Sequence, residues 1–151
     1  MRLMKSTDLA LRLLMSLAVV PGDADPDDLP TTRDAARSTG AAYTHMVKVV
    51  GRLQRYGLVQ ARRGRGGGLV LTPAGRAASV GAVVRAFEGS GDLAACMDGE
   101  ASCPINTACR LRSALSTAQE AFYASLDEVS VADVVAAPTG PLLLAIGRRG
   151  S

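Results

Sequence analysis

Three cysteines lie close together at Cys96, Cys103 and Cys109, with six residues between the first two and five between the last two. Structural zinc sites place ligands roughly two to four residues apart, and ferredoxin-type clusters use gaps of about two, so neither spacing fits. A disulfide would leave one thiol unpaired, and an odd count does not suit a disulfide framework. Three thiolates in one acidic, glycine-containing loop nevertheless predict a soft-metal site. An iron-sulfur cluster is the first candidate, because such clusters tolerate a fourth ligand other than cysteine.

The cysteine loop could instead serve a thiol enzyme or a structural zinc site. Cys103 could act as a nucleophile, since a helix is expected to begin near Pro104 or Thr107. Such chemistry needs a nearby base. The only histidine, His45, lies 58 residues upstream in a basic segment, so we predict that the protein is not an enzyme. The alternative of a DNA-binding protein with a structural zinc site and no cluster is not excluded by the sequence. Three cysteines also do not distinguish a 4Fe-4S from a 2Fe-2S cluster.

The charge of the chain is unevenly distributed. Residues 33–76 carry nine basic side chains and one acid, whereas residues 1–32 and 77–147 are both net acidic. A basic block of this kind predicts a surface for a polyanion, most simply nucleic acid. Aromatic residues make up 3% of the chain and tryptophan is absent, which disfavours proteins that stack single-stranded bases. Because no run of 18 apolar residues occurs and Asp8 and Arg12 interrupt the first apolar stretch, we expect a cytoplasmic protein with no membrane partner.

Two helices in the first half of the chain predict a helix-turn-helix. After a first helix, capped by Ser6 or Thr7 and running to about Val20, a short helix over 33–38 ends at Gly40 and a second spans about 42–55. The second helix directs an apolar face inward and a basic stripe outward. The stripe consists of His45, Lys48, Arg52 and Arg55. A stripe alone could be an ordinary solvated face, but it is also what a recognition helix carries into the major groove.

A hairpin follows and completes a winged helix-turn-helix. Short β-rich runs over 58–62 and 69–72 flank the sequence RGRGGG, whose glycines allow a tight turn. A phosphate-binding loop is disfavoured, because no lysine of the Walker type follows and the next element is a strand. We expect the recognition helix and the arginine-bearing wing to contact the major and the minor groove of DNA respectively. The predicted DNA-binding residues are Tyr43, Thr44, His45, Lys48, Arg52, Arg62, Arg63 and Arg65.

The second half of the chain is predicted to be helical around the cysteine loop. We expect a helix over 73–88, a loop over 92–107, a long helix over 107–126 and a short helix over 129–137. The long helix has an apolar stripe and little core of its own to cover, so pairing in a homodimer is expected. The fold class is therefore mainly α with a small β-hairpin wing. We divide it into a DNA-binding domain, 1–73, and a region of cluster-binding loop (92–109) and dimerisation helix, 74–151.

Several motifs together resemble one family of regulators. The sequence RRGRGGGLVLTPAG, then VVRAFEG, the three-cysteine loop and STDLALRLL near the start are similar to the dimeric winged-helix iron-sulfur regulators of the Rrf2 type. Within that family the cysteine spacing and the early acid resemble the nitric-oxide-sensing repressors. The resemblance implies a cluster, 4Fe-4S first, held by Cys96, Cys103, Cys109 and by Asp8 of the other subunit. It further implies that nitrosylation of the cluster releases double-stranded operator DNA.

The resemblance leaves alternatives for individual residues. Another branch of the family has a histidine ligand where this chain has Arg112, which argues against that branch. Without the resemblance, Asp8 would be interpreted as a first-turn acid or as the ion-pair partner of Arg12. We expect Arg12 to contact the proposed ligand Asp8 and not the cluster itself. His45 could be a fourth ligand, but its place on the basic stripe favours a DNA contact. A 2Fe-2S sensor of redox state or cluster supply on the same fold is the second interpretation.

Overall fold

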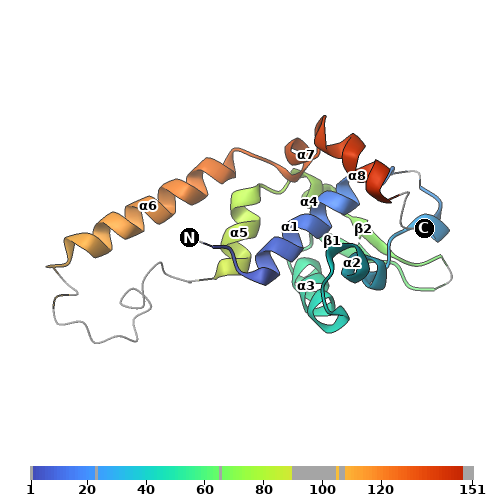
Figure 1. Ribbon diagram of the computed structural model, residues 1–151, viewed down its shortest axis with the longest axis horizontal. Coiled ribbons are helices and arrows are strands. Elements are labelled where there is room, and N and C mark those ends of the chain that lie inside the picture. Colours follow the sequence, from blue (N-terminus) through green and yellow to red (C-terminus); the bar gives the residue numbers. More distant parts are fainter. Residues whose placement is uncertain (1, 23, 65, 90–104, 106–107, 148–151) are drawn as a thin grey trace.

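The computed structural model describes residues 2–22, 24–64, 66–89, 105 and 108–147. Within these residues the chain is mainly helical with one two-stranded sheet, which confirms the predicted fold class (Figure 1). The elements are α1 (Lys5–Ala18), a 3-10 turn η1 (Pro26–Asp28), α2 (Thr32–Thr39), α3 (Tyr43–Arg55), β1 (Val59–Ala61), β2 (Leu69–Leu71), α4 (Pro73–Ala77), α5 (Val80–Glu88), α6 (Arg110–Asp127), α7 (Val131–Val134) and α8 (Thr139–Gly147). No helix of the described residues is long and apolar enough to span a bilayer.

Helix α1 forms the centre of the core. Leu9, Leu13 and Leu17 are at most 2% exposed, as their spacing of four residues predicts, and Leu14 beside them is fully buried. The helix begins two to three residues earlier than expected, with Met4 as N-cap and no side-chain cap. Thr7, one of the two predicted caps, is instead fully buried and its hydroxyl donates to the carboxylate of Glu88. The start of α1 is therefore held by α5 and not by a local cap.

Helices α2 and α3 form the predicted helix-turn-helix. Thr31 caps α2 in a reciprocal capping box: its oxygen accepts from the Asp34 amide at 3.2 Å, and its amide donates to the Asp34 carboxylate at 3.0 Å. Hydrogen bonds to the Asp34 carboxylate, from the Thr31 hydroxyl first and from its amide second, hold the pKa of Asp34 below its usual value, and nearby Arg37 and Arg33 lower it further. Gly40 ends α2 in the left-handed region, with φ of 64°, which glycine adopts without a steric penalty. The turn therefore follows from local sequence signals.

The wing is an antiparallel hairpin that packs on the segment before α2. Val59 pairs with Leu71 and Ala61 with Leu69. The Leu69 amide donates to the Pro30 carbonyl at 2.8 Å, which joins the hairpin to the start of the helix-turn-helix. A Cβ at Gly68 would lie 2.6 Å from the Leu29 side chain, so this close approach requires glycine. The wing base is thus fixed relative to α2 and α3.

The expected helix over 73–88 is wrong as one element, because it is broken into α4 and α5. Ala78 is extended, and its carbonyl accepts from the Val131 amide at 2.9 Å. The Val80 amide donates to the Val129 carbonyl at 2.7 Å, and Ser79 then caps α5. The backbone groups of Ala78 and Val80, which a continuous helix would pair internally, therefore hydrogen-bond to the segment 129–131, some fifty residues later.

The C-terminal elements also differ from the prediction. The short helix α7 is limited to Val131–Val134, and α8, which the sequence did not predict, follows it. Val131, together with Val83 and Phe87 of α5, belongs to the same buried cluster as α1 and α3. The proposed domain boundary at residue 73 therefore crosses a continuous core.

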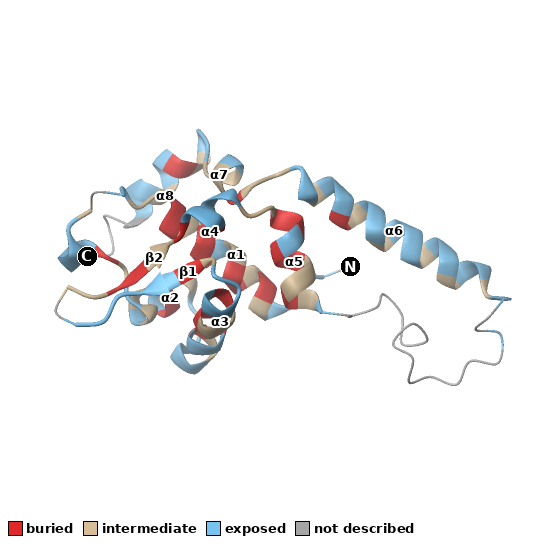
Figure 2. Cartoon of the chain, turned by 180° about the vertical axis from the view of Figure 1, so that it is seen from behind, coloured by how far each residue is buried: buried red, intermediate tan, exposed pale blue. Residues whose placement is uncertain are grey.

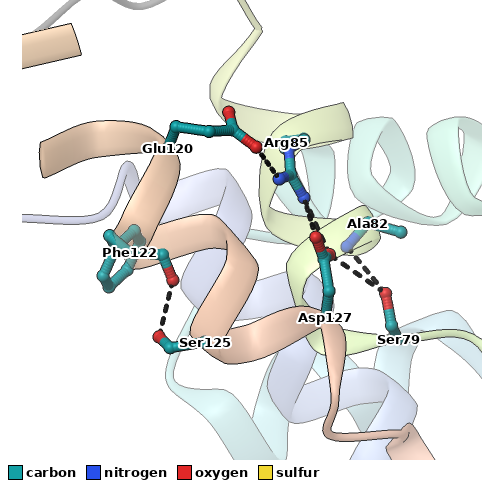
Figure 3. Close-up of polar contacts among 7 residues, drawn as sticks. All are labelled: Ser79, Ala82, Arg85, Glu120, Phe122, Ser125 and Asp127. Atoms are coloured by element: carbon teal, nitrogen blue, oxygen red, sulfur yellow. Dashed lines mark hydrogen bonds and ion pairs between the residues drawn. The ribbon is translucent and has the colours of Figure 1, made fainter. Parts of the chain in front are cut away.

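Helix α6 packs on the body through its second half. Arg85 of α5 donates to both oxygens of Asp127 and to Glu120, each at 2.7 Å (Figure 3). Its guanidinium also lies 4.7 Å from the centre of the Tyr123 ring. Hydrogen bonds to Asp127 first, and to Glu120 second, raise the pKa of Arg85. Tyr123 is the one residue of α6 that is buried. The first half of the helix projects from the body (Figure 1).

Candidate functional site

The outer side of α3 is polar and exposed. Tyr43, Thr44 and Lys48 are exposed and His45 is partly buried, whereas Met46 and Leu53 on the opposite side are fully buried. The core therefore fixes which side of α3 faces outward. Four of the predicted DNA-binding residues lie together on this outer side of one helix.

Arg33 of α2 extends this surface and was not singled out in the sequence. Its guanidinium lies 5.1 Å from the centre of the Tyr43 ring, a distance at which a cation attracts the face of an aromatic ring. Both side chains are exposed. In the sequence, Arg33 is recognisable only as one residue of the basic block 33–76. Its contact with Tyr43 cannot be predicted locally, because it depends on how α2 packs against α3.

Arg52 does not share the outward orientation that the stripe predicted. One of its guanidinium nitrogens lies 2.6 Å from the Ala86 carbonyl oxygen, and the group stacks 4.2 Å from the centre of the Phe87 ring. The Ala86 carbonyl belongs to the last turn of α5, where carbonyl groups without a partner in the helix and the helix dipole attract a cation. Arg52 is therefore engaged within the protein, and we do not carry it into the proposed DNA contacts.

The wing presents cationic side chains beside α2. Arg62 and Arg63 are exposed, and Arg65 lies outside the described residues. An open hollow of about 210 Å³ separates the wing from the start of α2. Thr31, Thr32 and Arg62 contribute its polar groups. The Thr31 hydroxyl and amide bind Asp34, so the donors that suit a phosphate group here are those of Thr32 and Arg62.

The proposed cluster ligands are only partly within the described residues. Cys109 is partly buried and occupies the N-cap of α6, whereas Cys96 and Cys103 lie outside the described residues. Asp8 lies in the first turn of α1, 48% exposed, and its carboxylate accepts from Arg12 Nε at 2.9 Å. Among the described residues no three cysteine, histidine or acidic side chains form a metal-binding group. Arg112, the position that separates the two branches, lies in the first turn of α6.

The last turn of α5 leads directly into the cysteine loop and contacts two other helices. From α1, the Met4 amide donates to Glu88 at 2.9 Å, and Thr7 donates to the same carboxylate. From α3, Arg52 binds the Ala86 carbonyl as described above, and the Tyr56 hydroxyl donates to the same carbonyl at 3.2 Å. This turn therefore links the helix that bears Asp8 with the helix that bears the polar outer face.

Comparison with protein families matches residues 3–137 to Rrf2, described as an iron-dependent transcriptional regulator. The chain is 56% identical over 151 residues to the HTH-type transcriptional repressor NsrR of Streptomyces coelicolor, covering 100% of this chain and 99% of the relative. It is 33% identical over 136 residues to the HTH-type transcriptional regulator NsrR of Halalkalibacterium halodurans, covering 89% of this chain and 90% of the relative.

Solved structures share the fold. T. potens IscR matches with a TM-score of 0.68 and 19% identity over 89% of this chain and 86% of that protein. The oxidized form of Staphylococcus aureus CymR matches with a TM-score of 0.65 and 23% identity over 89% of this chain and 95% of that protein. The family match and the full-length identity confirm the resemblance: this chain belongs to the Rrf2 family of transcriptional regulators, among its NsrR-type repressors.

Proposed function

We propose that this protein is a homodimeric repressor that binds double-stranded operator DNA and senses nitric oxide through an iron-sulfur cluster. The observation that carries the DNA-binding part is the exposed polar side of α3, with its opposite side buried and the exposed arginines of the wing nearby. A helix with such an outer face fits the major groove, and a cationic glycine-rich wing suits the negative potential of a narrow minor groove. Tyr43, Thr44, His45 and Lys48 contact bases and phosphates, while Arg62, Arg63 and Arg65 serve the wing.

The hollow beside the wing supplies a position for a backbone phosphate. Thr32 and Arg62 are among the residues that line it, beside the start of α2. Phosphate contacts fix the register of the protein on DNA, while contacts to base edges specify the sequence. In a dimer the two α3 helices would enter successive major grooves about 34 Å apart on a palindromic site. If the dimer neutralises about 6 to 10 phosphates, its affinity falls about 10³- to 10⁵-fold between 50 and 200 mM salt.

The donor chemistry of the chain fits an iron-sulfur cluster. Three thiols, Cys96, Cys103 and Cys109, supply the soft ligands that such clusters prefer, and Asp8 supplies a fourth ligand of a different kind. Cys109 lies at the end of α6 that projects from the body, whereas Asp8 lies on α1 within the body (Figure 1). This separation supports a site completed by Asp8 of the other subunit.

A cluster held by Cys96, Cys103, Cys109 and Asp8 would supply the reactivity toward nitric oxide, and we infer that its loss would be coupled to release of the operator. Asp8 is a hard oxygen ligand among soft thiolates, so it is the ligand most readily given up. Arg12 already holds this carboxylate in the free chain at 2.9 Å and offers it an alternative partner after it leaves the cluster. Loss of the Asp8 bond would free the first turn of α1 from the other subunit. The proposed site of action is the cytoplasm, where DNA is reached directly.

Anaerobic absorption spectra with iron and sulfide analysis, followed by titration with nitric oxide, test this proposal. About four irons and four sulfides per chain, bleaching on titration with parallel loss of DNA binding, would support it. About two irons with a reversible redox response would favour the 2Fe-2S sensor, and zinc or no metal would leave a DNA-binding protein without a cluster. Cys96→Ala, Cys103→Ala and Cys109→Ala should each lose the cluster and tight DNA binding together. Retained binding in all three variants would contradict the coupling of cluster and DNA.

A further inference from the structure

The last turn of α5 is enclosed by two helices that the proposed function uses for different purposes. Helix α1 carries Asp8, and helix α3 carries the outer face that contacts DNA. Both make polar contacts to the same turn, through the Glu88 carboxylate on one side and the Ala86 and Phe87 carbonyls on the other. The chain leaves this turn at Gly89 and reaches Cys96 seven residues later. The turn is therefore a place where the ligand-bearing segments and the DNA-reading helix meet.

The contact from α3 is specific in geometry. The Arg52 guanidinium donates to the Ala86 carbonyl at 2.6 Å, lies 3.5 Å from the Phe87 carbonyl and stacks at 4.2 Å on the centre of the Phe87 ring. Tyr56, one turn later, donates to the Ala86 carbonyl and meets the same ring edge to face, with centroids 6.2 Å apart. Phe87 is 1% exposed, so it cannot shift without disturbing the core. A rigid planar cation is thereby fitted between the ring and the end of the helix.

The contact from α1 lies next to the proposed ligand. Thr7, the neighbour of Asp8, is fully buried, and its hydroxyl and the Met4 amide both bind Glu88. A change in the position of Asp8 therefore moves a hydrogen-bonded neighbour of α5. The two carbonyls that hold Arg52 are one and two residues before Glu88, on the same helical turn. Displacement of this turn from either side alters the position of α3.

We propose that Arg52 is a positioning residue that couples the last turn of α5 to the orientation of α3 on DNA. The inference rests on the proposed function, because it describes how the state of the cysteine loop and of Asp8 reaches the DNA-reading helix. Arg52 touches no DNA in this arrangement. It holds α3 in the binding orientation only while the end of α5 keeps its place. Allosteric coupling of this kind typically changes affinity about 5- to 150-fold.

The test compares the DNA affinity of cluster-loaded and cluster-free protein for wild type and Arg52→Gln. The probe is a duplex selected from a random library by cluster-loaded wild-type protein. In wild type the loaded form should bind at least about fivefold more tightly. In Arg52→Gln this ratio should fall close to one, with unchanged iron content and an unchanged slope of log affinity against log salt. Arg52→Lys, which keeps the charge but not the planar group, should restore the ratio only in part.

Arg55→Gln is the matched control, because it removes the same charge from an exposed position on the same helix. It should lower the affinity of both forms alike and leave their ratio as in wild type. Equal losses in both forms of Arg52→Gln, with a salt slope reduced by about one, would show that Arg52 contacts phosphate and would overturn the inference. A wild-type ratio retained in Arg52→Gln would also overturn it. A wild-type ratio of one would instead overturn the proposed function, and the inference with it.

A second readout uses the cluster-free protein and needs no DNA. Amide hydrogen exchange should become faster in α3 and in the last turn of α5 when Arg52 is replaced by Gln, and Arg55→Gln should leave these rates unchanged. Unchanged rates in Arg52→Gln would contradict the positioning role. If Arg52→Gln fails to fold, Tyr56→Phe removes only the second hydrogen bond to Ala86. It should then shift the affinity ratio in the same direction by a smaller factor, and an unaltered ratio would count against the inference.

Discussion

The helix at the centre of the body and the long helix at its edge are of similar length but differ in burial. Of the 14 residues of α1, seven are buried, among them four leucines. Of the 18 residues of α6, only Tyr123 is buried (Figure 2). Leu111, near the start of α6, is 66% exposed. The body is therefore stabilised by contacts within one chain, whereas the apolar side chains in the first half of α6 are left largely uncovered in the single chain.

The two regions differ in how they are held together. In the body, apolar side chains from α1, α3 and α5 form one buried cluster. Helix α6 is joined to α5 by a smaller buried cluster of Val80, Val84 and Tyr123, and by the ion pairs of Arg85 at its rim. Solvent-exposed ion pairs contribute little to stability compared with burial of apolar side chains. The ion pairs thus help to fix the direction of α6, while its attachment rests mainly on this small apolar cluster.

The largest effect should come from a cavity in the body. Leu13→Ala removes a side chain that is 1% exposed and should lower the free energy of unfolding by about 2–5 kcal/mol. Leu142→Ala in α8, where the side chain is 62% exposed, should change it by less than about 0.5 kcal/mol. Urea denaturation of the cluster-free protein measures both. Equal losses in the two variants would show that α8 is as well packed as α1.

The next effect concerns the association of two chains through α6. Leu111→Glu places a charge on the exposed apolar stripe and should weaken the homodimer at least about tenfold, because a desolvated charge opposes burial. Its effect on monomer stability should be small. Sedimentation equilibrium measures the dissociation constant, and Thr117→Glu, at an exposed position of the same helix, is the control. A dimer unaffected by Leu111→Glu would place the subunit interface elsewhere.

The elements that could be predicted from the sequence are those with local signals. Thr31 and Asp34 form the start of α2, Gly40 ends it, and the glycines between two β-rich runs form the wing. The break at Ala78 could not be predicted, because its hydrogen bonds go to residues near Val131. Local patterns of this kind give no information on partners that are distant in the sequence.

The candidate site shows the same division. The outward position of Thr44 and Lys48 follows from helical periodicity, which places them opposite Met46. The orientation of Arg52 depends on the end of α5, some thirty-four residues later, so periodicity alone could not predict its contact with the Ala86 carbonyl. The proposed fourth ligand also lies beyond local patterns. Asp8 was assigned to the site through the family resemblance alone, because its spacing from Arg12 already explains an acid there.

A smaller effect separates the capped helix of the body from the exposed helix at the edge. Thr31→Ala removes the N-cap of α2 and should cost about 1 kcal/mol of unfolding free energy. Thr117→Ala removes a hydroxyl that donates to the Ser113 carbonyl within α6, and should be neutral or slightly stabilising because alanine favours the helix interior. Thermal or urea denaturation under one buffer condition measures both. A larger loss in Thr117→Ala than in Thr31→Ala would contradict the assignment of stability to the body.

The smallest expected effect is the dependence of stability on pH through Asp34. The Thr31 hydroxyl and amide bind the ionised carboxylate and hold the pKa of Asp34 below its ordinary value of 3.8 in the folded chain. Above 3.8 the carboxylate is ionised in both states, so this contribution is fully present. As the pH falls below 3.8, the unfolded chain takes up a proton first, and the contribution is lost on passing through the lower folded pKa. Asp34→Asn and Thr31→Ala should therefore both flatten the fall in unfolding free energy below about pH 4, measured by urea denaturation at successive pH values. A wild-type slope retained in both variants would mean that other carboxylates dominate acid unfolding, and that the cap of α2 contributes the same stability whether or not Asp34 is ionised.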